Sequence, residues 1–84
     1  MFKVIGTDTY LKEISKLPKD IQKRIFGVLD RIRIRPEAHV TKLVGEHSYK
    51  LRVGDYRIIL DIEKNKLLIL IINVGHRKNI YKTI

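Results

Sequence analysis

The chain has 84 residues, with 18 Lys and Arg against 9 Asp and Glu, and it carries a formal charge of +9. It contains no Cys, which excludes disulfides and thiolate metal sites, and its longest apolar run, 67–72, is too short to span a bilayer. Such an excess of positive charge favours nucleic acid, anionic lipid or an acidic protein as partner. The alternative is a soluble domain that merely happens to be basic. No signal peptide pattern is present, so we expect a single cytoplasmic domain over residues 1–84, with a modest core and no membrane partner.

The first half of the sequence predicts a strand followed by two helices. The strand is expected over 2–7, and Thr7 or Asp8 can cap a helix that runs to about residue 16. Pro18 suits the first position of a second helix, in which apolar residues recur at helical spacing. This helix is predicted to end near Arg35, because a residue before proline is disfavoured in the helical conformation. The two helices should form a hairpin with a very short connection.

Three strands are predicted in the second half, over 48–53, 56–63 and 67–74, after an irregular polar stretch at 36–47 in which Gly45 indicates a turn. The last strand is apolar at almost every position, so we expect it in the interior of the sheet and covered on both faces. The order of elements predicts an α+β fold. Its N-terminal strand and helical hairpin should pack on one face of an antiparallel sheet of about four strands.

Gly54 and Asp55 indicate a two-residue type II′ turn between the first two of these strands. Such a turn pairs the residues that flank it and places Arg52 directly opposite Arg57. Because side chains alternate along a strand, Lys50, Arg52 and Arg57 should project from the sheet face away from the helices. Like charges directly across a sheet are destabilising, and a phosphodiester would reverse that effect. The alternative is that these residues are solvated surface charges.

The remaining chemistry-bearing residues follow the last strand. Gly75-His76-Arg77 can bring further groups to the rim of the basic face, although strand parity does not fix the direction of Arg77. Neighbouring cations favour the ionised form of a phenol, so Tyr81 is a candidate general base. The alternatives are that Tyr81 covers the core and that His76 is a surface hydrogen-bonding residue.

Common catalytic motifs are absent, and His39, His47 and His76 lack metal-ligand spacing. We therefore expect neither a metal nor a cofactor, and any catalysis must depend on Lys, Arg, Tyr and His side chains. That set suits attack of an RNA 2′-hydroxyl on its adjacent phosphate. This reaction requires in-line alignment, stabilisation of negative charge and proton transfer, and Arg matches phosphate oxygens with two parallel donors.

The sequence resembles the RelE/ParE superfamily of toxin–antitoxin modules over nearly its whole length. The resemblance rests on Leu17-Pro18, Tyr49-Lys50-Leu51-Arg52, Gly54-Asp55-Tyr56-Arg57-Ile58-Ile59 and Val74-Gly75-His76-Arg77, in this order. It implies the RelE-like microbial ribonuclease fold. It also implies a type II toxin that is a ribosome-dependent endoribonuclease (mRNA interferase), which cleaves mRNA in the ribosomal A site without a metal and so inhibits translation.

The resemblance also suggests roles for individual residues. Arg57 and Arg77 would stabilise the phosphorane charge. Tyr81 would be general base, stacking platform or both, at a shorter spacing from Arg77 than in some members. The other residues implied are Lys50 as a second proton carrier and Arg52, His76 and Lys78 as RNA-binding residues.

The partners implied are an acidic, RelB-like antitoxin, the ribosome and mRNA. Two rival functions stay open. One is a ParE-like inhibitor of DNA gyrase, and the other is a non-catalytic basic module that binds nucleic acid or an antitoxin.

Overall fold

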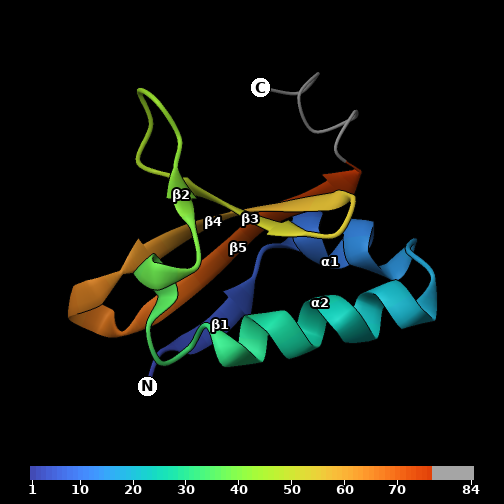
Figure 1. The fold of residues 1–84 in the computed structure, drawn as a ribbon, viewed down its shortest axis with the longest axis horizontal. Helices are drawn as coiled ribbons and strands as arrows, with labels where there is room; N and C mark the ends of the chain where they lie inside the picture. Colours follow the sequence, from blue (N-terminus) through green and yellow to red (C-terminus); the bar gives the residue numbers. More distant parts are fainter. Residues whose placement is uncertain (77–84) are drawn as a thin grey trace.

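The computed structural model describes residues 1–76 (Figure 1). The elements are β1 (Lys3–Gly6), α1 (Asp8–Ser15), α2 (Lys19–Arg31), the 3-10 turn η1 (Pro36–Ala38), β2 (Thr41–Lys42), β3 (Tyr49–Val53), β4 (Tyr56–Glu63), the 3-10 turn η2 (Lys64–Lys66) and β5 (Leu68–His76). One five-stranded sheet has the order β1-β5-β4-β3-β2. The predicted α+β fold with its helical hairpin is confirmed. The sheet is mixed, because β1 pairs with β5 in parallel and the other neighbours are antiparallel.

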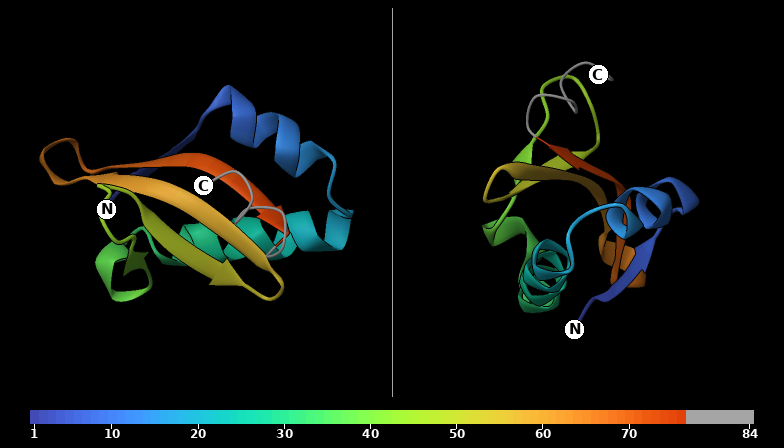
Figure 2. Two further views of the ribbon diagram at one scale, coloured as in Figure 1. Left: turned by 90° about the horizontal axis from the view of Figure 1, so that it is seen from above. Right: turned by 90° about the vertical axis from the view of Figure 1, so that its right-hand side faces the viewer.

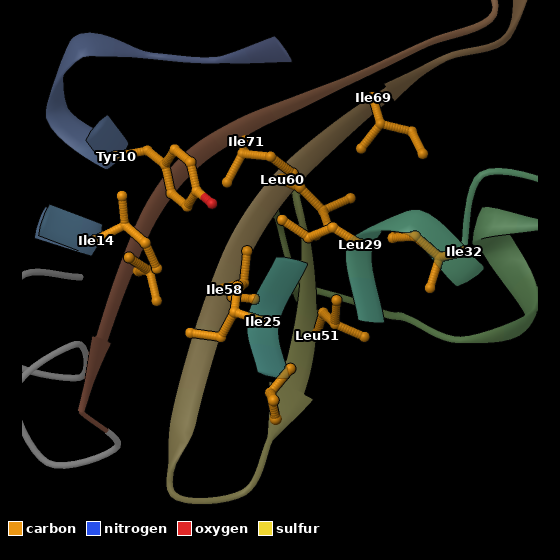
Figure 3. Packing of buried hydrophobic residues seen from close by; sticks show 12 residues of the cluster. Tyr10, Ile14, Ile25, Leu29, Ile32, Leu51, Ile58, Leu60, Ile69 and Ile71 are labelled. Carbon is orange, nitrogen blue, oxygen red and sulfur yellow. The ribbon is translucent and has the colours of Figure 1, made fainter. Parts of the chain in front are cut away.

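The two helices contribute to one hydrophobic core in different ways. Figure 2 shows α2 crossing below the sheet, whereas α1 lies alongside β5. The hydrophobic core lies between the helices and the sheet (Figure 3). Its buried residues are Tyr10, Ile14, Ile25, Leu29, Ile32, Leu51, Val53, Ile58, Leu60, Ile69, Ile71 and Val74. Burial of each large aliphatic side chain contributes about 1.5–3 kcal/mol, so this cluster is the main source of stability.

The entry into α1 depends on a close contact with β1. The Oγ1 atom of Thr7 accepts a hydrogen bond from the backbone N of Tyr10 at 3.2 Å, and Thr7 is therefore the predicted helix cap. A Cβ atom at Gly6 would lie 2.5 Å from the ring of Tyr10, so the glycine lets this ring enter the core. Tyr10 is 5% exposed, and its burial raises the pKa of the phenol.

Helix α2 ends at Arg31, one turn before the predicted end near Arg35. The residues that follow leave the helix because Arg33 bonds to the segment that leads into β1. The backbone N of Phe2 donates to the carbonyl O of Arg33 at 2.9 Å, and Nε of Arg33 donates to the carbonyl O of Phe2 at 2.9 Å. Arg35 itself is extended, with φ −145° and ψ 72°, as the proline rule requires.

The polar stretch 36–47 is more ordered than predicted. It contains η1 and β2, and β2 pairs Thr41 with Lys50 and Lys42 with Tyr49. A strand of two residues is too short to show a periodic pattern in the sequence, so the pattern does not predict β2. The turn at Gly45 is confirmed, with φ +76°.

The turn between β4 and β5 is anchored to this segment. The Nζ atom of Lys64 lies 3.0 Å from Oε2 of Glu37, and that hydrogen bond raises the pKa of Lys64.

Strand β5 lies between β1 and β4, so its interior position is confirmed. Its core-facing residues are buried, but those of its other face are only half-buried. Neither described helix is long and apolar enough to cross a membrane.

Candidate nucleic-acid interface

The β3–β4 hairpin has the predicted register. Val53 pairs with Tyr56, and Arg52 pairs with Arg57. The turn has φ +60° at Gly54, and Asp55 keeps a negative φ, which is the pattern of a type II′ turn. A Cβ atom at Gly54 would also lie 3.2 Å from Nη1 of Arg24. Glycine at this position therefore serves both the backbone conformation and the close approach of α2.

Lys50, Arg52 and Arg57 lie on the sheet face away from α2. Their neighbours in sequence, such as Leu51 and Ile58, belong to the core, so alternation places the three cations on the opposite face. Lys50 pairs with Ile59 on β4, and Arg57 stands between Arg52 on β3 and a glycine of β5. We call Lys50, Arg52 and Arg57 the cationic face.

The three cations differ in exposure, which the strand pattern did not predict. Arg57 is buried, with 9% of its surface exposed, whereas Lys50 is half-buried and Arg52 is exposed. Arg57 lies on β4, which has a strand on either side. Arg52 lies on β3 beyond the end of β2, and its Nε donates to the carbonyl O of Gly54 at 3.3 Å. The alternative that these residues are solvated surface charges therefore does not describe Arg57.

The end of β5 brings a glycine next to Arg57. Gly75 pairs with Arg57, and His76 pairs with Tyr56. The rings of Tyr56 and His76 meet edge to face, with centroids 5.6 Å apart. His76 thus lies at the exposed rim, on the opposite side of β5 from Gly75.

Three of the residues proposed for the site, Arg77, Lys78 and Tyr81, lie outside the described residues. Within residues 1–76, no three His, Asp or Glu side chains come together in a group that could hold a metal ion. The charges that the structure does bring together are the guanidinium and ammonium groups of the cationic face. A guanidinium in a low-dielectric setting attracts an oxyanion more strongly than an exposed one, and Arg57 is the most buried of the three residues.

Two contacts near this region were not predicted from the sequence. Arg24 approaches the hairpin turn from α2, and Glu13 reaches β5 from α1, where its Oε1 accepts from the backbone N of Val74 at 3.0 Å. Both contacts join elements far apart in the chain. No local spacing or motif could have indicated them.

Two pockets lie apart from the centre of the cationic face. A groove of about 460 Å³ lies between β1 and the helices, lined by Lys3, Val4, Gly6, Tyr10, Phe26, Leu29, Asp30 and Arg33. A second, of about 330 Å³, reaches the edge of the cationic face and is lined by Val28, Arg31, Ile32, His39, Leu51 and Arg52. We place the candidate site on the sheet, because a polyanionic strand is held by cations on an open surface rather than by an apolar cavity.

Solved structures share the fold of this small basic α+β domain. A chain in the RelBE2 toxin–antitoxin complex of Mycobacterium tuberculosis superimposes with a TM-score of 0.84 at 24% identity, covering 90% of this chain and 91% of that one. A chain in the archaeal RelE–RelB complex of Pyrococcus horikoshii superimposes with a TM-score of 0.78 at 28% identity, covering 90% and 94%. The RelE-like fold is therefore shown.

Sequence comparison supports the same assignment. The toxin RelE3 of Methanocaldococcus jannaschii is 34% identical over 85 residues, with 94% of each chain covered. The model of the family described as the ParE toxin of type II toxin–antitoxin systems matches residues 4–81. The chain belongs to this family of toxins, and the resemblance to the RelE/ParE superfamily is confirmed.

Proposed function

We propose that this protein is the toxin of a type II module and that it cleaves mRNA in the ribosomal A site. The observation that carries the proposal is the row formed by Arg52, Arg57 and Gly75 on three adjacent strands. The central residue of the row, Arg57, is buried. In the sequence, Arg77 follows two residues after Gly75 of this row.

The proposed chemistry is attack of a ribose 2′-hydroxyl on the adjacent phosphate, which yields a 2′,3′-cyclic phosphate and a 5′-hydroxyl. Arg57 and Arg77 stabilise the additional negative charge of the phosphorane. Tyr81 acts as general base, stacking platform or both, and Lys50 exchanges protons. Arg52 and Lys78 hold the RNA. His76 lies on the other side of β5 from Gly75, so it can reach the RNA only around the exposed end of that strand. The reaction uses no metal and no cofactor, and it takes place on cytoplasmic ribosomes.

The test is translation of a defined mRNA in vitro, with the RNA ends mapped by primer extension. Cleavage is expected on translating ribosomes and not on naked RNA. Substitution of Arg57 or Arg77 by Ala should lower the rate at least ~10²-fold, the scale of losing one transition-state donor. Equal cutting of naked RNA would contradict ribosome dependence, and no cutting in either setting would contradict the nuclease.

The proposed partner is an acidic, RelB-like antitoxin, since two structurally similar toxins were solved in complexes with RelB proteins. We propose that this chain folds on the toxin, neutralises part of the +9 charge and covers the cationic face. Affinity should fall with salt, because the screening length shrinks to about 3 Å at 1 M. Affinity that stays the same between 0.1 M and 1 M salt would contradict a mainly electrostatic contact.

A second candidate function is inhibition of DNA gyrase, which the ParE description of the matching family favours. A gyrase supercoiling assay separates the two. Inhibition of supercoiling without mRNA cleavage would replace the nuclease proposal. Growth that continues when the protein is produced without its antitoxin would instead indicate a non-catalytic module.

A further inference from the structure

One edge of β5 loses its strand neighbour partway along its length. The pairing of β1 with β5 ends at Gly6 and Ile71, whereas β5 runs on to His76. Helix α1 lies alongside the remaining part of that edge (Figure 2). Backbone donors and acceptors on an open edge need other partners.

Residues of α1 and its cap provide those partners. The backbone N of Thr7 donates to the carbonyl O of Ile71 at 2.9 Å, and Oγ1 of Thr7 donates to the carbonyl O of Ile72 at 2.6 Å. One turn and a half further on, Oε1 of Glu13 accepts from the backbone N of Val74 at 3.0 Å. Hydrogen bonding thus continues along β5 after β1 has ended. The bond to Glu13 is charge-assisted, which makes it stronger than a neutral one.

These contacts flank an irregularity in β5. Ile59 pairs with Asn73 but Leu60 pairs with Ile71, so Ile72 is an additional residue on the β5 side. Such a bulge changes which side chains face each way. With regular alternation from Ile71, the core would receive Asn73. Instead Val74 is buried.

The bulge therefore decides what lies next to Arg57. It places Gly75 opposite Arg57 and turns His76 to the other side. A shift of one residue exchanges the two faces of a strand.

We propose that Glu13 is a positioning residue for the nuclease site, acting with Thr7 to hold the bulge of β5 and so to keep Gly75 opposite Arg57. This rests on the proposed function. Glu13 touches the backbone of β5 and does not contact the cationic face, so it acts through the strand.

The experiment compares Glu13→Ala with Glu13→Gln. Both variants lose the same charge, but only the glutamine keeps an oxygen that accepts from Val74. Hydrogen exchange of the Val74 amide, followed by NMR in the free toxin, should accelerate about tenfold in Glu13→Ala, and exchange in Glu13→Gln should stay close to wild type. If Glu13→Ala does not fold, Glu13→Asp, whose carboxylate is one methylene shorter, takes its place.

The second readout is single-turnover cleavage of mRNA on programmed ribosomes. Glu13→Ala should lower the maximal rate about tenfold with ribosome affinity nearly unchanged, because a misplaced group costs rate rather than binding. Glu13→Gln should restore most of the rate. Unchanged exchange at Val74 would overturn the strand contact, and faster exchange with an unchanged rate would overturn the positioning role. A wild-type protein that cleaves nothing would overturn the proposed function instead, and the exchange data would still decide the contact.

Discussion

Arg52 and Arg57 stand directly opposite each other on adjacent strands, yet one is exposed and the other is buried. The difference follows from sheet order, since β4 has a neighbour on each side and β3 is flanked by β2 only at Tyr49 and Lys50. The two guanidiniums therefore face different dielectric surroundings, and we expect them to have separable roles in catalysis and binding.

Replacement of Arg57 by Ala should reduce the maximal cleavage rate at least ~10²-fold, because the proposed reaction loses a donor to the phosphorane. The measurement is single-turnover cleavage at saturating ribosome concentration. Arg35→Ala removes an exposed arginine outside the cationic face and is the matched control. Equal rates in these two variants would show that Arg57 has no special part in the reaction.

Replacement of Arg52 by Ala should weaken binding and leave the maximal rate within a few-fold of wild type. An exposed cation contributes through a phosphate contact whose loss is felt in affinity and in its salt dependence. The slope of log K against log salt should fall by about one unit. A large loss of rate at saturation, with affinity intact, would assign Arg52 to the chemical step.

Gly54→Ala should destabilise the protein more than Gly45→Ala. Both glycines have positive φ, so both substitutions introduce backbone strain of about 1 kcal/mol. Only at Gly54 would the new Cβ meet a neighbour, Nη1 of Arg24 at 3.2 Å, while nothing lies within 4 Å at Gly45. Urea unfolding at neutral pH measures the difference. Equal losses would mean that the side chain of Arg24 moves aside without cost.

Tyr10 should make stability fall at alkaline pH. Burial raises its pKa above the ordinary value of 10.0, so the folded state holds the phenol proton more tightly than the unfolded chain. The contribution is complete below pH 10 and is lost as the pH rises through the folded pKa. Urea unfolding between pH 8 and pH 11 should show a smaller decline in Tyr10→Phe than in wild type. Parallel declines would remove Tyr10 as the cause.

The hairpin could be predicted in detail because its turn is local. Gly54 and Asp55 fix the turn type, and the turn type fixes the pairing of Arg52 with Arg57. The helices were predicted for the same reason, since caps and apolar spacing act within a few residues.

Features that depend on distant segments could not be predicted. The parallel pairing of β1 with β5 joins the two ends of the described chain, and the two-residue strand β2 exists only because β3 is there to pair with it. The bulge at Ile72 lies in a uniformly apolar run, in which no alternation reveals an extra residue. The position of His76 therefore could not be read from strand parity.

The short length of β2 has a consequence for solubility. Within residues 1–76, the edge of β3 beyond Lys50 has no partner strand. An unpaired strand edge can pair with the edge of another copy of the protein and so lead to aggregation. Arg52 lies on this unpaired edge, where its positive charge would repel Arg52 of a second molecule. The positive charge that we propose for RNA binding would thus also oppose self-association.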